Sequence, residues 1–135
     1  MPRVAVALMG LMPGLYRLLK GRGMSWSLIL TTVGAKTGLK RDAHLTAFPE
    51  ADSWLVVGSK GGSATHPAWY INMARNPDQV WVEVGNRRTR VKPETLKGAD
   101  RAKAWRRIVS EYGNYGAYEK KTDREIPVVR LTPAA

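Results

Sequence analysis

Short runs of β-branched and apolar residues, separated by turn-forming residues, recur along the chain from residue 27 onward. They predict strands over 27–33, 42–48, 53–58, 79–84, 87–91 and 128–131. Two of the links are typical of hairpins, namely Pro49-Glu50-Ala51-Asp52 and the two-residue loop Gly85-Asn86. Several short strands joined by hairpins favour an antiparallel meander or a small barrel.

Helical periodicity interrupts the strands twice. Pro67 suits the first turn of a short helix, which we expect to end at Arg75, before Asn76-Pro77. A second helix is predicted over 99–112, where the apolar residues at helical spacing are Ala102, Trp105, Ile108, Val109 and Tyr112. We expect its other side to be a solvated basic face, formed by Arg101, Lys103, Arg106 and Arg107. The fold class is therefore mostly β with some α, an α+β domain.

An almost wholly apolar segment, 4–19, precedes the first strand. It is too short and too interrupted, by Gly10, Pro13 and Arg17, for a convincing transmembrane helix. No small-residue cleavage site follows it, so a signal peptide is also disfavoured. Two interpretations remain: a helix docked on the domain, which we favour, or an interfacial segment that enters a membrane surface. The predicted organisation is an apolar helical segment over 1–24 and a barrel domain over 25–135.

Composition restricts the chemistry that the domain can perform. A chain of 135 residues has the usual size of a single domain. The absence of cysteine excludes disulfides and thiolate sites, and the two histidines, His44 and His66, have few acidic neighbours, so we expect no metal site. The formal net charge of +11 predicts attraction to a polyanion, whether nucleic acid, an acidic lipid surface or a charged cofactor.

Two loops that combine glycine with lysine follow predicted strands. The first is Thr31-Thr32-Val33-Gly34-Ala35-Lys36-Thr37-Gly38, and the second is Gly58-Ser59-Lys60-Gly61-Gly62. Glycine lets the backbone approach a ligand closely, and lysine or threonine supplies a charge or a hydroxyl for a phosphate. Neither the spacing of a Walker A loop nor that of a Rossmann fingerprint is present. The alternative is that both loops are hairpin connections with solvated lysines.

Three tyrosines, Tyr112, Tyr115 and Tyr118, recur at intervals of three near the end of the second predicted helix. The glycines between them make one continuous helix doubtful, yet a helical turn still brings the rings towards one side. Such rings can stack on a planar ligand or donate a phenolic hydrogen bond. Alternatively, they cover a small core.

Five motifs in a consistent order carry a resemblance to a known family. They are T-T-x-G-x-K-T-G followed by Arg41, S-K-G-G at 59–62, P-x-W-Y-x-N at 67–72, the three tyrosines, and Thr122-Asp123-Arg124-x-Ile126-Pro127. In this order the chain resembles the deazaflavin-dependent nitroreductase family over about residues 28–133. The resemblance implies a split β-barrel related to the FMN-binding oxidoreductases, with an N-terminal helix and two further helices.

The resemblance also implies a cofactor, the anionic 5-deazaflavin coenzyme F420, and a place for it. The phosphate and the start of its acidic tail would contact Lys36, Thr37, Gly38 and Arg41. The deazaflavin and its ribityl chain would lie along Ser59, Lys60 and Gly61. The ring would be walled by Pro67, Ala68, Trp69 and Asn72.

The implied reaction is hydride transfer from the reduced coenzyme to an electron-poor conjugated acceptor, such as a quinone, enone, unsaturated lactone or nitroaromatic compound. Candidate donors of a hydrogen bond to the acceptor oxygen are Ser59, Tyr115 and Tyr118. The substrate side would be lined by Thr46, Tyr112, Tyr115 and Tyr118. Better-known nitroreductases of the family carry an aromatic residue near Thr46, so the small side chain here predicts a differently shaped acceptor pocket.

Cellular placement follows from the same resemblance. In some members the N-terminal segment is thought to lie against the membrane, close to quinone substrates. We therefore expect a cytoplasmic protein with scope for peripheral contact at the inner face of the cell membrane through residues 1–24. The sequence leaves the physiological acceptor and the oligomeric state open.

Two other functions are compatible with the sequence. One is a non-catalytic binder or carrier of an anionic cofactor or lipid on the same barrel. The other is a basic nucleic-acid-binding barrel that uses residues 87–107, with Trp81 or Trp105 for stacking. Only charge favours the latter, and Trp105 falls on the apolar side of its helix, so we expect no nucleic-acid partner.

Overall fold

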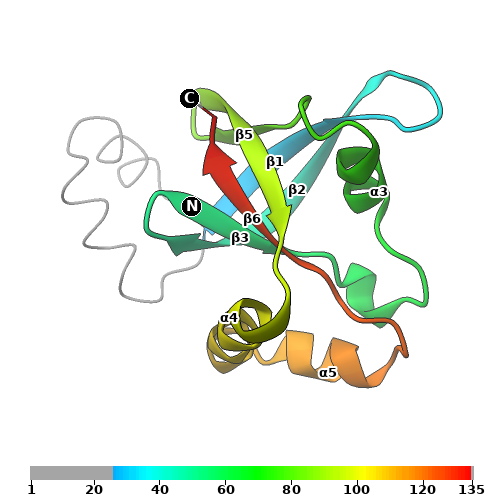
Figure 1. Cartoon of the computed structure of the whole chain (residues 1–135), viewed down its shortest axis with the longest axis vertical. Coiled ribbons are helices and arrows are strands. Elements are labelled where there is room, and N and C mark those ends of the chain that lie inside the picture. The colour runs from blue at the N-terminus through cyan, green and yellow to red at the C-terminus, as the bar shows by residue number, and fades with distance from the viewer. Residues whose placement is uncertain (1–25, 135) are drawn as a thin grey trace.

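Six antiparallel strands form a closed barrel in the computed structural model, which describes residues 26–134 (Figure 1). Around the barrel the strands follow the order β1-β2-β3-β6-β5-β4. Their bounds are β1 Trp26–Val33, β2 Lys40–Glu50, β3 Ser53–Val57, β4 Trp81–Val84, β5 Arg87–Thr95 and β6 Val128–Pro133. All six predicted strands and the antiparallel barrel are confirmed. The predicted N-terminal helix and the boundary after residue 24 lie outside the described residues.

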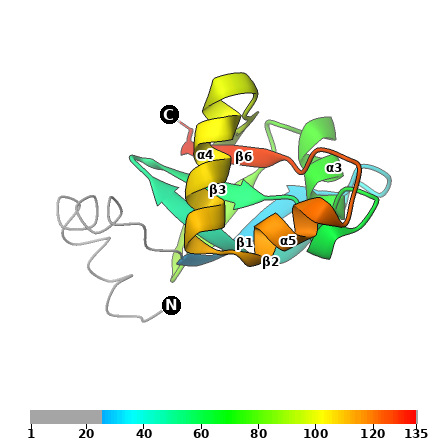
Figure 2. The ribbon, with the colours of Figure 1, turned by 90° about the horizontal axis from the view of Figure 1, so that it is seen from below.

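Within residues 26–134, three α-helices and one 3-10 turn interrupt the strands. The two predicted helices are present as α3 (Ala68–Arg75) and α4 (Gly98–Glu111). The sequence did not predict a further helix, α5 (Asn114–Lys120). This helix begins directly after Gly113, shortly after α4 ends at Glu111. The 3-10 turn η1 (Lys60–Gly62) lies in the second glycine-lysine loop. Figure 2 shows α4 and α5 across one end of the barrel, and Figure 1 shows α3 on another side.

The apolar residues form two buried clusters. The first fills the barrel and includes Leu30, Val82 and Leu131, and Trp69 and Met73 of α3 pack into it. The second joins α4 to the strands and consists of Phe48, Leu55, Val57, Leu96, Ala104, Trp105, Ile108, Ile126 and Val128. Trp105 is therefore a core residue, as its position on the helix predicted, and is not available as a stacking platform.

The basic face predicted for α4 is only partly solvated. Lys103 and Arg106 are exposed. Arg101, however, donates from Nη2 to the carbonyl oxygen of Ile126 at 2.7 Å, and its side chain is 14% exposed. Arg107 pairs with Glu111 at 2.9 Å, one helical turn later. These two arginines anchor α4 locally because their guanidinium groups find acceptors in the fold. The prediction that Ala102 lies on the apolar side of this helix was wrong, because Ala102 is exposed.

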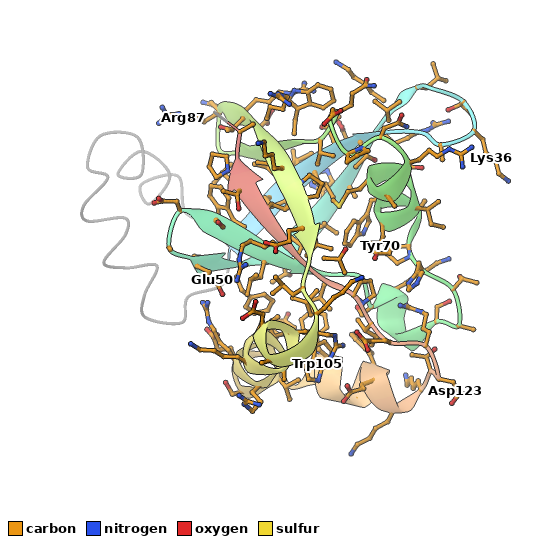
Figure 3. The ribbon with its side chains drawn as sticks, in the orientation of Figure 1. Lys36, Glu50, Tyr70, Arg87, Trp105 and Asp123 are labelled. Carbon is orange, nitrogen blue, oxygen red and sulfur yellow. The ribbon has the colours of Figure 1, made fainter. Side chains whose placement is uncertain are left out.

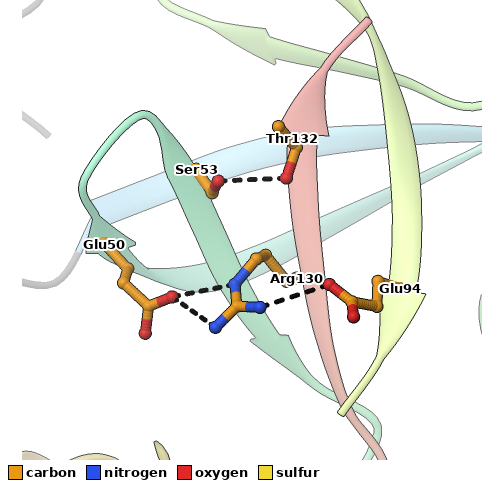
Figure 4. Close-up of polar contacts among 5 residues, drawn as sticks. All are labelled: Glu50, Ser53, Glu94, Arg130 and Thr132. Atoms are coloured by element: carbon orange, nitrogen blue, oxygen red, sulfur yellow. Dashed lines mark hydrogen bonds and ion pairs between the residues drawn. The ribbon is translucent and has the colours of Figure 1, made fainter. Parts of the chain in front are cut away.

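A polar clamp ties three strands on the outside of the barrel (Figure 4). Arg130 on β6 donates to Glu50 on β2 at 2.8 Å and to Glu94 on β5 at 3.2 Å. Beside it, the hydroxyls of Ser53 and Thr132 lie 3.0 Å apart. The clamp spans the junction at which β6 closes the barrel. Within the described part of the chain, no helix is both long and apolar enough to cross a membrane.

Candidate active site

A pocket of about 450 Å³ lies between the β1–β2 loop and α3. Figure 3 shows Lys36 at this loop, Tyr70 on α3, and Asp123 farther along the same side of the molecule. The pocket combines cations with an aromatic and aliphatic wall. Its lining consists of Thr32, Gly34, Ala35, Lys36, Thr37, Arg41, Asp42, Ala43, Ala68, Trp69, Ile71 and Asn72. An anionic ligand that also carries a planar ring would match both parts of this lining.

The β1–β2 loop is closed by its own hydrogen bonds. The amide of Gly34 donates to the carbonyl oxygen of Leu39 at 2.8 Å, and that of Gly38 donates to Gly34 at 2.9 Å. The Thr37 hydroxyl accepts the amide of Leu39 at 3.2 Å. A Cβ at position 34 would lie 2.6 Å from this hydroxyl oxygen and 3.3 Å from the carbonyl oxygen of Leu39, so a larger residue there would displace the Thr37 side chain. Thr37 therefore holds the loop shape, while Lys36 is exposed.

Asn72 connects this loop to α3. Its Oδ1 accepts the backbone amide of Ala35 at 3.0 Å, and its Nδ2 donates to the Thr32 hydroxyl at 3.3 Å. The Asn72 side chain is buried, so both amide groups are satisfied away from water. At the same edge, Thr31 donates to the Asp42 carboxylate at 2.7 Å. These contacts within the protein hold the pocket wall in place independently of a ligand.

The second glycine-lysine loop follows β3 and has an unusual backbone. Lys60, Gly61 and Gly62 all have positive φ, with values of 47°, 63° and 83°. A Cβ at Gly62 would lie 2.9 Å from the carbonyl oxygen of Tyr118, so the loop packs closely on α5. At Gly61 a Cβ would meet nothing within 4 Å. The backbone at Gly61 is therefore open to an approaching ligand, whereas Gly62 is required by packing.

The side chain of Arg124 hydrogen-bonds to several residues of this loop. Its guanidinium donates to the carbonyl oxygens of Ser59 at 2.7 Å, Ser63 at 2.9 Å and Gly58 at 3.0 Å. The Nη1 atom also lies 3.0 Å from Nδ1 of His66. Burial and, secondarily, the charge of Arg124 lower the pKa of His66 below 6.5. The imidazole is therefore neutral at pH 7, and Nδ1 accepts from Arg124.

The three tyrosines form a chain of ring contacts over Phe48. The ring centroids of Phe48 and Tyr115 are 6.0 Å apart, those of Tyr112 and Tyr115 are 5.5 Å apart, and those of Tyr115 and Tyr118 are 5.8 Å apart. Burial, followed by the neighbouring tyrosines, raises the pKa of Tyr115 above 10, although a hydrogen bond with Thr46 opposes the shift. The Tyr115 phenol therefore stays protonated and able to donate at neutral pH.

The structure divides the predicted site residues into two groups. Lys36, Thr37, Arg41, Ala68, Trp69 and Asn72 line one pocket. The second loop and α5 carry the others, which are Ser59, Lys60, Gly61, Tyr115 and Tyr118, with Tyr112 at the end of α4. Three predicted residues belong to neither group: Gly38 is exposed on the first loop, Pro67 is buried near Gly58, and Thr46 lies on β2, where its side chain hydrogen-bonds with Tyr115.

Aromatic contacts link the two groups. The Trp69 ring, in the pocket wall, lies 6.2 Å from that of Tyr70, which lies 5.0 Å from the imidazole of His66. The sequence analysis assigned no role to Tyr70, His66 or Arg124. Arg124 did stand within one of the five motifs, but nothing in the local sequence indicates that its acceptors are 58 to 66 positions away.

Comparison with solved structures defines the class of protein first. A structure titled as an F420-H2 dependent reductase (FDR-A) is 38% identical, covers 78% of this chain and 92% of its own, and has a TM-score of 0.69. Another, described as a domain-swapped dimer, is 32% identical, covers 93% and 98%, and has a TM-score of 0.70. The predicted split-barrel fold of F420-dependent reductases is thus confirmed.

The family follows from the sequence comparison. Residues 14–133 match the family described as F420H(2)-dependent quinone reductase, and the chain belongs to it. A curated F420H(2)-dependent quinone reductase of Mycobacterium tuberculosis (strain H37Rv) is 40% identical over 138 residues, covering 96% of this chain and 92% of its own length. The protein is therefore an oxidoreductase with coenzyme F420 as its cofactor, as the motifs predicted.

The residues present fit this cofactor. Lys36 and Arg41 supply positive charge on one side of the pocket, and no ion pair engages either of them among residues 26–134. Trp69 and Ala68 supply an apolar wall opposite them. A phosphodiester with an acidic tail requires the former, and a planar deazaflavin requires the latter.

Proposed function

We propose that the protein uses reduced F420 to reduce quinones, and that the pocket between the β1–β2 loop and α3 is where the coenzyme binds. The observation that carries this proposal is the presence of Lys36 and Arg41 in the same pocket as Trp69. When bound, the reduced coenzyme supplies a hydride to an electron-poor acceptor. The protein supplies binding, orientation and hydrogen-bond donors.

Binding of the anionic part is assigned to the first loop. Lys36 and Arg41 contact the phosphate and the start of the acidic tail, since both are exposed cations at the pocket. Thr37 and Gly38 contribute through the loop that presents Lys36. Asn72 acts mainly through the backbone of Ala35, because both of its amide atoms already have partners within the fold.

Placement of the ring is assigned to the second loop and α3. Ser59, Lys60 and Gly61 lie along the deazaflavin and its ribityl chain, and the open space at Gly61 supports close approach. Ala68 and Trp69 wall the ring, and Pro67 supports that wall by packing behind Gly58. These residues would hold the deazaflavin ring, and the tyrosines would then be available on the acceptor side.

The acceptor is assigned to the tyrosine side. Tyr115 is a phenol whose raised pKa keeps it protonated, so it can donate a hydrogen bond to an oxygen that gains negative charge. Ser59 and Tyr118 are the other candidate donors, and Tyr112 and Thr46 line the same space. Quinones are the primary acceptors, and the same donors suit enones, unsaturated lactones and nitroaromatic compounds.

Location and assembly form a separate part of the proposal. We assign the protein to the cytoplasm. Peripheral contact of residues 1–24 with the inner face of the membrane, where lipid-soluble quinones are found, is the alternative to the favoured docked helix, and the apolar character of that segment is compatible with both. A homodimer is supported by the related structure described as a domain-swapped dimer.

The decisive experiment combines binding with turnover. Fluorescence titration of the purified full chain with F420, and with FMN in parallel, should show a saturable preference for the deazaflavin. Anaerobic mixing with reduced F420 and a quinone, an enone or a nitroaromatic compound should then show acceptor-dependent reoxidation, fastest for the quinone. Tight binding without reoxidation by any acceptor would instead indicate a carrier. Absence of F420 binding would refute the proposal.

A further inference from the structure

Arg124 is a partly buried arginine whose partners are neutral. It makes no ion pair within residues 26–134, although Asp123 and Glu125 are its chain neighbours. Instead, all of the described hydrogen bonds of its side chain go to three carbonyl oxygens and one imidazole nitrogen. A guanidinium presents several donors in a fixed plane, so it can bind several acceptors at once, which a lysine ammonium cannot match in geometry.

The four acceptors lie at both ends of the same loop. Gly58 and Ser59 form its beginning, and Ser63 and His66 form its end. Arg124 therefore joins the two ends of the loop, in addition to the side-chain hydrogen bonds among Lys60, Ser63 and Thr65 and the packing of Gly62 on α5. The backbone bonds inside the loop are Gly62 to Ser59 at 3.0 Å and Ser63 to Lys60 at 3.1 Å.

The loop needs such a restraint because its backbone is strained. Lys60 has a φ of 47°, a left-handed conformation that disfavours residues with a Cβ. A residue in this region persists only when its surroundings impose the conformation. The carbonyl groups that Arg124 binds belong to the residues on either side of Lys60 and Gly61. The guanidinium thus fixes the two ends between which the strained segment is held.

We infer that Arg124 is a positioning residue for the reductase site: it holds the loop 58–66 in the conformation that places Ser59 and Lys60 against the cofactor. This inference rests on the proposed function, because it assumes that the loop contacts the coenzyme. Arg124 itself acts through the loop, since its described donors are all directed at Gly58, Ser59, Ser63 and His66.

A second route links Arg124 to the pocket wall. By donating to Nδ1 of His66, it places the imidazole proton on Nε2 and orients the ring. That ring packs on Tyr70, whose own ring packs on Trp69 in the pocket. The charged and titratable groups identified around His66 are Arg124 and Tyr70. One guanidinium therefore restrains both the second loop and the aromatic side of α3.

The test uses Arg124→Gln and Arg124→Lys, with Arg130→Gln as a matched control. Arg130 is also partly buried and multiply bonded, but its partners are Glu50 and Glu94, away from the loop. Both Arg124 variants should lower kcat/KM by as much as about 10²-fold, since small displacements of positioning groups have effects of that size. Arg124→Lys should not retain more of the kcat/KM than Arg124→Gln does. Arg130→Gln should lower the thermal unfolding temperature without this loss.

NMR spectroscopy supplies readouts that do not depend on the coenzyme. In the Arg124 variants the amides of Gly62 and Ser63 should exchange faster with solvent. In Arg124→Gln, which removes the positive charge, the His66 ring should also titrate closer to pH 6.5. Unchanged exchange and an unchanged His66 titration would overturn the inference, whatever happens to activity. The same loop changes in Arg130→Gln would also overturn it, because the effect would then be general loosening.

A measurement on the unaltered protein covers the case in which neither variant folds. The Nε–H of Arg124, which donates to Ser63, should exchange more slowly than that of the exposed Arg106. Equal exchange rates would contradict the inference. If the unaltered protein fails to bind F420, the proposed function falls, while the exchange and titration data still decide whether Arg124 holds the loop.

Discussion

Asn72 and Ala35 lie 37 positions apart in the chain, and the side-chain oxygen of the former accepts the backbone amide of the latter at 3.0 Å. This bond joins α3 to the loop that carries Lys36. Asn72→Ala should lower the free energy of unfolding by about 1–3 kcal/mol, because it leaves a backbone donor unsatisfied near the buried edge of the pocket. Urea denaturation measures the change.

The matched control for this variant is Asn76→Ala. Asn76 directly follows α3 and donates to the carbonyl oxygen of Val33 at the end of β1, but at 3.4 Å and from a less buried position. Its removal should have a clearly smaller effect on stability. Equal losses in the two variants would show that the Asn72 bond has no special role in holding the loop.

Charge at the pocket should dominate coenzyme affinity. Lys36→Ala, Arg41→Ala and Lys60→Ala should each weaken F420 binding by about 1.5–3 kcal/mol, or roughly 10- to 100-fold in Kd, if each makes a charge-assisted hydrogen bond. Fluorescence titration at fixed ionic strength measures the effect. Lys103→Ala, which removes an exposed charge on α4, serves as the control and should leave Kd almost unchanged. A uniform loss across all four variants would indicate unspecific charge attraction.

Stability should depend on the protonation of His66. Its pKa in the folded protein is below 6.5, so the unfolded chain binds this proton more readily. The contribution of His66 is therefore fully present above pH 6.5 and is lost as the pH falls through the folded pKa. His66→Asn, which retains an acceptor near the position of Nδ1, should remove this component. The urea midpoints of the unaltered protein and of His66→Asn, measured between pH 8 and pH 5, should therefore become more similar as the pH falls. A constant difference between the two midpoints over this range would contradict a role for His66 protonation.

The glycine at the start of the second loop is required by its close contact with Pro127. A Cβ at Gly58 would lie 2.8 Å from Cγ of Pro127 and 3.5 Å from Cγ of Pro67. Because proline rings are rigid, Gly58→Ala should destabilise the fold by about 1–3 kcal/mol. Gly113→Ala is the control, since a Cβ there meets nothing within 4 Å and its φ is −60°. The control should be neutral or slightly stabilising in thermal unfolding.

Tyr115→Phe should separate turnover from coenzyme binding. The phenol is a protonated donor, and its loss should lower kcat by up to about 10²-fold, the effect of removing one oxyanion donor, with little change in the Kd of F420. Since the pKa of Tyr115 is raised, the phenol itself should not limit activity as the pH rises towards 10. Stopped-flow reoxidation of reduced F420 by a quinone gives both quantities. An unchanged kcat would remove Tyr115 from the acceptor site.

Much of the fold is predictable because it depends on local pattern. The six strands follow from β-branched runs, and the Gly85-Asn86 turn follows from residues that favour a two-residue hairpin loop. The end of α4 was less predictable, since the apolar spacing continues to Tyr112 while the chain bends at Gly113 to begin α5. The low helix propensity of glycine permits the interruption between α4 and α5. Tyr112 and Tyr115, on either side of it, pack on Phe48.

The site was predictable in its residue types and less so in its internal connections. Lysines and glycines in loops indicate an anion, and the pocket brings Lys36, Arg41 and Trp69 together as expected. Sequence alone could not show that Thr37 and Asn72 hydrogen-bond within the first loop and its surroundings, because those partners are set by tertiary structure. The role of Arg124 was hidden for the same reason.

The position of β6 has a consequence for how the protein is made. This strand pairs with β3 on one side and with β5 on the other, so it closes the barrel, and it follows the other five described strands along the chain. Until residues 128–133 have left the ribosome, β3 and β5 present open edges, which are prone to pairing with other chains. Premature termination before Val128 should therefore yield an aggregation-prone product, and expression yield should depend strongly on chaperones that shield nascent chains.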